Sequence, residues 1–358
     1  MKTLSTMSRK RLAEIVARFP SLRVAVLGDF FLDKYLDVDA SIADVSVESG
    51  KTAHQVVAIR HSPGAAGTVV SNLAALGTGT LYAIGFTGDD GESYDLRSDL
   101  EHMRCSTEHL HVAKDRMTPT YLKPRYIHDK SLTGEHERYD TKNRTETPER
   151  LEKAVIDSLE ALLAGLDAVV VADQVETDDC GVVTNKVRSA VAQRARRHPR
   201  VVFWADSRAH IRQFRNVITK PNQFEAVGKD KPRPGEKVAF DALVEAVTLL
   251  RGGTGAPVFA TMGPKGIMVT DPEFTLVPGV RVAGETDTTG AGDSATAGAV
   301  LALAAGAACP EAALVANLVA SITIEQLATT GTARPEELPP RLEIWLKQRR
   351  DDRVDHAS

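Results

Sequence analysis

The sequence is poor in the features that mark disulfide-rich, zinc-binding, membrane and nucleic-acid-binding proteins. Its 358 residues include three cysteines, Cys105, Cys180 and Cys309, which stand far apart without a CxxC pair. A disulfide framework and a zinc knuckle are therefore not expected, and a reducing cytosol fits. No stretch approaches the roughly 20 apolar residues of a membrane span. Because the net charge is only −4, nothing favours a polyanion partner. We expect a cytoplasmic protein with neither a membrane nor a nucleic-acid partner.

Two common nucleotide-binding motifs are also missing. The first strong strand signal ends in GDFFLD (residues 28–33) rather than in the G-x-G-x-x-G turn that seats a dinucleotide. No G-x-x-x-x-G-K-[ST] sequence occurs either, which argues against a Walker-type NTPase. A zinc hydrolase would need clustered ligands, and the close pair His109 and His111 is better explained as strand or loop surface.

What the chain does contain is an alternation of apolar strands and amphipathic helices. Hydrophobic residues make up 42% and charged residues 26%, which is typical of a globular protein. Short apolar runs predict strands at 23–28, 81–86, 168–172, 201–205, 257–261 and 266–269, and helical periodicity appears at 67–76, 148–163, 181–197 and 239–250. This pattern predicts a mainly parallel sheet covered on both faces, with ligands beyond the carboxyl ends of its strands. We expect one α/β domain over 1–340 and a charged C-terminal tail over 341–358.

Two separated segments break this alternation. Residues of about 34–62 and 117–141 contain alternating polar and apolar positions with little helical periodicity, which predicts strands that face water on one side. We interpret them as a small β lid standing off the main body. The alternative is that they form extra strands at the edge of the main sheet.

The segment most indicative of chemistry is DTTGAGD, residues 287–293, followed by the alanine-rich run SATAGAVLALAA. Small residues allow a tight turn at the start of a helix, where free N–H groups and the helix dipole attract anions. Asp293 at this position is either a helix cap or a catalytic base. Phosphoryl transfer needs both an anion hole and a base beside the attacking hydroxyl, and this segment supplies both within four residues.

This motif resembles the signature of the ribokinase/PfkB family of carbohydrate kinases, and other motifs agree in order. GDFFLD resembles the family's first strand end, PGAAG (63–67) its sugar loop, KPNQFE (220–225) its N-x-x-E motif and MGPKG (262–266) its nucleotide loop. The resemblance spans roughly residues 22–335 and is greatest for the heptose-phosphate kinase branch, as judged from GDxxLD, ERYD (137–140) and Gly331-Thr332. It implies a ribokinase-like three-layer α/β/α fold with a small β lid, and ATP-dependent phosphorylation of a sugar or sugar-phosphate hydroxyl.

The resemblance also implies roles for individual residues. Asp293 would be the general base, and the amides of Gly290, Ala291 and Gly292 would form the anion hole. The substrate would be bound by Asp29, Asp33, Gly64, Ala65, Thr68, Arg125 and Arg138. ATP would be bound by Lys220, Asn222, Glu225, Gly263, Gly266 and Asn317. Mg²⁺ would lie near Asn222 and Glu225 through water, and a monovalent cation such as K⁺ near Asp287 and Thr289.

Two departures from the family pattern fall on the substrate side. Ala65 replaces the second glycine of the sugar loop, and Thr68 stands where the family has an asparagine. The segment ADQVE, residues 172–176, lacks the lysine-glycine ending of heptose-phosphate relatives. Lys123, Arg125 and Arg138 on the expected lid could bind a phosphate already present on the substrate. The sequence therefore predicts the reaction type but leaves the sugar open.

Two other functions fit the same fold. A nucleoside kinase would use lid aromatics such as Tyr121, Tyr126 and Tyr139 to pack on a base, although aromatic residues total only 5%. A catalytically silent sugar- or nucleotide-binding regulator would explain the altered glycine loop, but the retained turn and Asp293 argue against it. We also expect a homodimer formed through the lid.

Overall fold

A seven-stranded parallel sheet forms the centre of the computed structural model, which describes residues 2–128, 136–229, 232–233, 235–327 and 330–355. Its strands run in the order β12 (Ile218–Thr219), β11 (Val202–Ser207), β10 (Ala168–Asp173), β2 (Arg23–Gly28), β5 (Thr80–Gly88) and β6 (Cys105–Ser106), and β7 (Leu110–Ala113) also pairs with β5. In the central register, Val170 lies opposite Val26 on one side and Trp204 on the other. The expected parallel sheet is confirmed.

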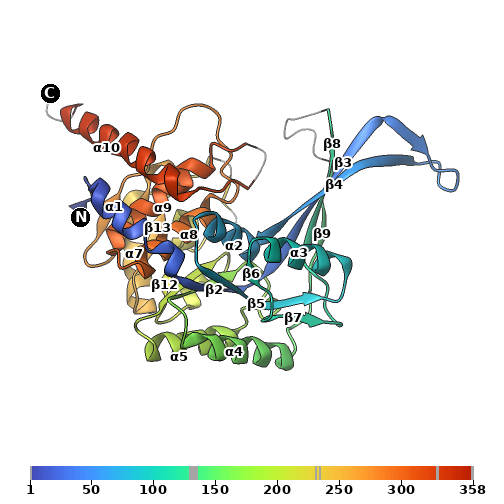
Figure 1. The fold of residues 1–358 in the computed structure, drawn as a ribbon, viewed down its shortest axis with the longest axis horizontal. Coiled ribbons are helices and arrows are strands. Elements are labelled where there is room, and N and C mark those ends of the chain that lie inside the picture. The colour runs from blue at the N-terminus through green and yellow to red at the C-terminus, as the bar shows by residue number, and fades with distance from the viewer. Residues whose placement is uncertain (1, 129–135, 230–231, 234, 328–329, 356–358) are drawn as a thin grey trace.

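Helices cover both faces of this sheet because its strands are apolar on both sides. Val24 and Val26 of β2 belong to a core shared with α2 (Ala66–Ala75) and α8 (Ala291–Ala304). Ala25 and Leu27 point the other way, into a core shared with α4 (Glu149–Leu163) and α5 (Asn185–Arg197). Figure 1 shows α4 and α5 below the sheet and α2 above it. The result is the three-layer α/β/α arrangement.

A second, four-stranded sheet continues the first beyond β12. Its order is β1 (Lys2–Thr3), β15 (Thr275–Val277), β14 (Ile267–Val269) and β13 (Phe259–Thr261). A parallel bridge between Thr219 and Val258 joins the two sheets. The β13–β14 and β14–β15 pairs are antiparallel, and the tight GPK turn at 263–265 reverses the chain between β13 and β14.

The two segments expected to form a lid make a separate four-stranded sheet. It contains β4 (Thr52–Ala65), β3 (Phe30–Val45), β8 (Thr120–Tyr126) and β9 (Tyr139–Thr141), and we call it the lid sheet. Figure 1 shows the β3–β4 hairpin extending away from the helical body, while the base of each strand stays close to the central sheet. Residues 129–135 of the expected lid lie outside the described residues.

The remaining helices are α1 (Arg9–Val16), α3 (Gly91–His102), α6 (Gln223–Ala226), α7 (Phe240–Thr254), α9 (Cys309–Thr323) and α10 (Leu338–Asp355). The expected charged tail from residue 341 onward is not what the structure shows, because this segment forms most of α10. Leu342 and Trp345 are fully buried, so the helix is docked on the body by an apolar stripe. Within the described part of the chain, no helix has the length and apolar character needed to cross a bilayer.

Candidate active site

The turn before α8 has the geometry of an anion-binding helix start. Gly290 is the N-cap residue and has a φ of 74°, a left-handed conformation that glycine adopts without strain. A Cβ on Gly290 would lie 2.8 Å from Thr330 Cγ2 and 3.5 Å from Thr68 Cγ2, so the turn packs closely against α2. The amide of Ala291 donates to Thr288 O at 3.1 Å. It is therefore already engaged, whereas the amides of Gly290 and Gly292 have no backbone acceptor among the residues that the structure describes.

Asp293 lies in the first turn of α8, half-buried. Burial and, next, the neighbouring Asp206 carboxylate raise its pKa to about 7, although Lys220 opposes the rise. Within the described residues its carboxylate accepts no hydrogen bond from the protein, so it does not cap its own helix. A carboxylate with a pKa near neutrality is a far better proton acceptor than one near 4.

Lys220 lies at the centre of a charged cluster beneath this turn. The residue follows β12 and is buried, and its Nζ lies 2.9 Å from Asp206 Oδ2. Burial would lower its pKa, but Asp206, Glu225 and Asp293 raise it above its ordinary value. A Cβ on Gly292 would be 3.4 Å from the same Nζ, so the ammonium group reaches the anion-binding turn.

Asn222 and Glu225 form a capping box at the start of α6. Asn222 Oδ1 accepts from the amides of Phe224 and Glu225, and Glu225 Oε2 accepts from the amide of Asn222 at 2.7 Å. One carboxylate oxygen of Glu225 is thus engaged in capping its own helix. Burial raises the pKa of Glu225 to about 7 against the opposing effect of Lys220, and Asp206 adds to the rise.

A cavity of about 530 Å³ leads away from the turn along α9 and the second sheet. Ala291 and Gly292 line one end of it, and the expected nucleotide-binding residues Gly263, Gly266 and Asn317 line its walls. Gly266 has a φ of 97°, and a Cβ there would lie 2.1 Å from Val277 O, so only glycine fits. Asn317 donates Nδ2 to Val277 O at 2.9 Å. Its amide group therefore fixes the wall of the cavity that Asn317 lines.

Two contacts connect Asp33, Gly64, Ala65 and Thr68 with the turn: Asp33 packs on Gly64, and Thr68 packs on Gly290. A Cβ on Gly64 would lie 2.9 Å from Asp33 Oδ2, so the carboxylate packs directly over this glycine. Thr68 lies in the first turn of α2 against Gly290. Ala65 has a φ of 53°, a backbone conformation that is strained for a residue with a Cβ. The chain thus keeps the backbone path of a glycine loop after losing the second glycine.

The carboxylate of Asp29 is engaged by the protein itself. Its carboxylate is buried and accepts three backbone amides, those of Gln174, Val175 and Val182, at 2.7–3.1 Å. Burial and the neighbouring Asp173 raise its pKa to about 6 in spite of these bonds. Asp29 therefore anchors the loop 174–182, and its expected sugar contact stays a prediction.

The lid cations separate into two groups. Lys123 Nζ lies 2.8 Å from Asp33 Oδ1, and Arg138 lies over the ring of Tyr121 at 4.4 Å, so both are near the Asp33 side of the lid sheet. Arg125 faces Asp37, four residues further along β8 than the Asp33–Tyr121 pair. At about 3.3 Å per residue this position is about 13 Å away from that pair. Arg125 is therefore not brought to Asp33.

Asp287 and Thr289 hold the start of the turn. Asp287 Oδ1 accepts from the amide of Thr289 at 2.9 Å, and the amide of Asp287 donates to Ile324 O. Among the residues that the structure describes, no group of three His, Cys, Asp or Glu side chains could hold a metal ion. The expected cation sites would therefore need water or substrate oxygens as further ligands.

The structure adds three residues that the motifs did not predict. Asp206 is the penultimate residue of β11, and its place directly after the strand predicted at 201–205 was the available signal. Lys142 and Arg144 follow β9 and line a small cavity of about 150 Å³ together with Phe31 and the loop 174–182. No sequence motif marked them.

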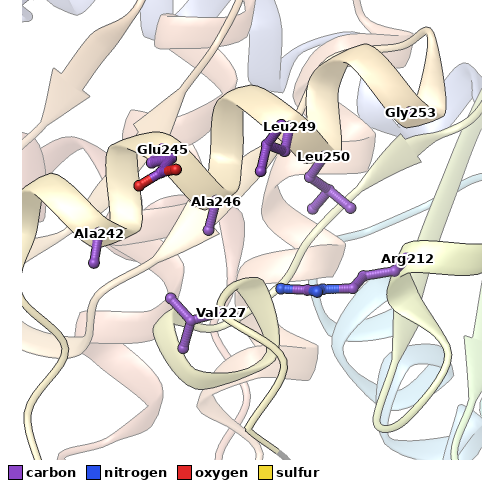
Figure 2. A pocket seen from close by; sticks show the side chains of 8 residues that line it. All are labelled: Arg212, Val227, Ala242, Glu245, Ala246, Leu249, Leu250 and Gly253. Carbon is purple, nitrogen blue, oxygen red and sulfur yellow. The ribbon is translucent and has the colours of Figure 1, made fainter.

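A third cavity lies apart from these residues. It has a volume of about 340 Å³ and lies between one face of α7 and two residues near α6, Arg212 and Val227. Figure 2 shows the helix presenting Ala246, Leu249 and Leu250 toward it. None of the expected catalytic or binding residues lines it, so the candidate active site is the region around Asp293.

Comparison with known proteins agrees with this geometry. The model of the pfkB family carbohydrate kinases matches residues 23–336. The chain is 30% identical over 328 residues to the bifunctional protein HldE of Stutzerimonas stutzeri, which covers 89% of this chain and 63% of that protein. It is 28% identical over 320 residues to HldE of Aliarcobacter butzleri, and this match covers 87% of the present chain and 63% of that protein. The chain thus spans somewhat under two thirds of the length of these relatives.

Solved structures agree on the fold. Arabidopsis thaliana ribokinase complexed with ribose and ATP matches 90% of this chain and 99% of its own with a TM-score of 0.63 at 16% identity. Escherichia coli phosphofructokinase-2 in complex with potassium matches 90% of this chain and 99% of its own, with a TM-score of 0.65 at 17% identity. The fold is therefore ribokinase-like, as expected. From the family match over most of its length, the chain belongs to the pfkB family of carbohydrate kinases.

Proposed function

We propose that this protein transfers the γ-phosphoryl group of ATP to a hydroxyl of a sugar or sugar phosphate, with Asp293 as the general base. The observation that carries the proposal is the position of Asp293, whose pKa is about 7, in an anion-binding turn where the cavity of about 530 Å³ ends. Asp33 and Gly64 lie on the other side of this turn. A nucleotide in the cavity and a polyol beside Asp33 would therefore meet at Asp293.

The residues of this chain divide the work of phosphoryl transfer. The amides of Gly290 and Gly292, together with the Lys220 ammonium group, stabilise negative charge on the transferred group. Asp293 accepts the proton of the attacking hydroxyl as its oxygen bonds to phosphorus. Asp33 accepts hydrogen bonds from two neighbouring hydroxyls and so orients the sugar.

The charge balance beneath the turn fits a divalent cation. Three carboxylates, those of Asp206, Glu225 and Asp293, surround Lys220, and the pKa values of Glu225 and Asp293 are both raised to about 7. A cation of higher charge would relieve this excess of negative groups. Mg²⁺ usually keeps several waters and takes few carboxylates, so Glu225 and Asp206 would hold it through water while it neutralises ATP phosphates. We propose K⁺ at the Asp287–Thr289 turn on the resemblance alone.

The acceptor side favours a polar, anionic substrate over a nucleoside. Tyr121 is flanked by Lys123, Arg138 and Lys142, whose charged groups lie 4.4–6.0 Å from its ring centre. A base could not pack on a ring face that cations already cover. We therefore infer a sugar phosphate of the heptose-phosphate type, whose phosphate would be bound by these cations. The relatives named HldE support this choice.

We also propose that two copies associate through the lid sheet. Its β3–β4 hairpin exposes Ile42, Val45, Val57 and Ile59, each at least half exposed. Alternating apolar residues on an open sheet are typical of a contact surface. Sedimentation velocity of the wild type and of Ile59→Glu would test the association, and a wild-type monomer at micromolar concentration would contradict it.

A substrate screen tests the proposed reaction. ADP formation from magnesium-ATP is measured with free sugars, sugar 1-, 6- and 7-phosphates and nucleosides. We expect turnover with a sugar phosphate and none with nucleosides. Turnover with nucleosides alone would contradict the proposal, and ATP binding without turnover on any polyol would favour a regulator.

A further inference from the structure

Helix α10 contacts the wall of the nucleotide cavity through one polar face. Arg341, Trp345, Gln348 and Asp352 are spaced by four, three and four residues, which places them one above another on the same side of the helix. Each of them contacts a segment that lines the cavity or adjoins it. The opposite side of the helix carries Lys347 and Arg350, which are exposed.

The main contacts are made with the backbone of residues 278–281. Trp345 Nε1 donates to Pro278 O at 2.8 Å. Gln348 holds Arg281 from both ends of its amide, since Oε1 accepts from Arg281 N at 3.0 Å and Nε2 donates to Arg281 O at 2.8 Å. Asp352 pairs with the guanidinium group of Arg281 at 2.8 Å. The residues between these anchor points, Gly279 and Val280, line the cavity.

The hydrogen bonds from α10 give residues 278–281 the partners that a neighbouring strand would otherwise provide. Residues 278–283 follow β15 but have no regular secondary structure, so their backbone groups lack a sheet neighbour. The side chains of α10 supply partners for these groups, at the buried Pro278 carbonyl and at the exposed Arg281. On the other wall, Arg341 donates to Ser321 O at 3.2 Å, and Ser321 lies on α9 beside the cavity. Helix α10 thus contacts two walls of the cavity, the segment 278–281 and helix α9.

Packing alone does not require this polar face. Leu338, Leu342 and the Trp345 ring are fully buried and suffice to dock α10 on the body. The polar groups of Trp345 and Gln348 additionally hold the segment 278–281 in one position. We propose that α10 is a positioning element for ATP, and that Trp345 and Gln348 act by holding Gly279 and Val280 in the shape that binds the nucleotide. This inference rests on the assignment of the cavity to the nucleotide.

The test compares Gln348→Ala with Lys347→Ala, its exposed neighbour on the same helix. ATP dissociation constants are measured by calorimetry without any acceptor, and KM values for ATP and acceptor are measured separately. Loss of one or two neutral hydrogen bonds predicts about a two- to tenfold weaker ATP affinity for Gln348→Ala, with kcat and the acceptor KM unchanged. Lys347→Ala should match the wild type. Trp345→Phe, which keeps the ring and loses the N–H donor, should also weaken ATP binding.

Two results would overturn the inference. In the first, Gln348→Ala and Lys347→Ala bind ATP equally well. In the second, Gln348→Ala raises both KM values together with a fall in Tm, which would indicate a general structural role. Ala320→Phe separates this inference from the proposed nucleotide site, because the added ring would fill the cavity. Undiminished ATP binding in Ala320→Phe would remove the nucleotide from this cavity altogether. ATP binding lost in Ala320→Phe but unchanged in the α10 variants would overturn only the role of α10.

Discussion

The two sides of the candidate active site are built in different ways. The nucleotide side is a cavity of about 530 Å³ shaped by backbone, by glycines such as Gly266 and Gly292, and by small side chains. The acceptor side is lined by charged side chains that already pair with one another, as Lys123 does with Asp33 and Arg138 with Asp140. A shape fixed by backbone admits one class of ligand, whereas paired side chains can exchange partners. The difference explains why the reaction can be assigned more firmly than the sugar.

The largest expected effect is at the point where the two sides meet. Asp293→Asn removes the proton acceptor while keeping the shape, so kcat should fall about 10²- to 10⁴-fold, and ATP affinity measured by calorimetry should stay near the wild-type value. Glu285→Gln, an exposed change in the preceding loop, is the matched control. Turnover by Asp293→Asn close to the wild-type rate would remove Asp293 from the mechanism.

A pair of glycine variants tests whether the two sides are independent. Gly292→Val places a branched side chain on the anion-binding turn, toward Lys220, and should weaken ATP binding about tenfold or more. Gly64→Ala puts a Cβ 2.9 Å from Asp33 Oδ2, so it should displace this carboxylate and raise the acceptor KM several-fold. Each variant should leave the other ligand unaffected. If both variants change both ligands equally, the division into two sides is wrong.

The pH dependence should follow the raised pKa of Asp293. Because only the ionised carboxylate accepts a proton, kcat/KM should rise with pH and level off above about 7. Stability should change in the opposite direction. The folded protein holds this proton up to about pH 7, whereas an unfolded aspartate loses it near 3.8, so the contribution is present at low pH and is lost as pH rises through 7. Urea unfolding at pH 5.5 and 8 should show a smaller loss for Asp293→Asn than for the wild type.

The sequence was sufficient to predict the features that depend on the backbone. Apolar runs predicted the central strands, and DTTGAGD predicted the turn because its glycines have no other role at a helix start. It was insufficient for contacts that need the fold. The hydrogen bonds from Asp29 to the loop 174–182 could not be predicted, because the closeness of this loop depends on β2 and β10 being neighbours. Helix α10 looked like a charged tail, because the few buried residues that dock it, such as Trp345, are diluted by exposed charges.

The smallest expected effect concerns the one place where the acceptor side does depend on backbone geometry. Ala65 has a φ of 53° and a ψ of −117°, a conformation that costs a residue with a Cβ about 1–3 kcal/mol. Ala65→Gly removes this strain but adds about 0.4–1 kcal/mol of unfolded-chain entropy, so we expect a net gain of about 1 kcal/mol, measured by urea unfolding. Ala66→Gly, one residue later in the first turn of α2, should instead lose about 0.5–1 kcal/mol. If Ala65→Gly also leaves the acceptor KM unchanged, then side chains rather than the path of this loop determine the choice of sugar. A loss of stability in Ala65→Gly would mean that contacts of the Ala65 methyl group outweigh the strain.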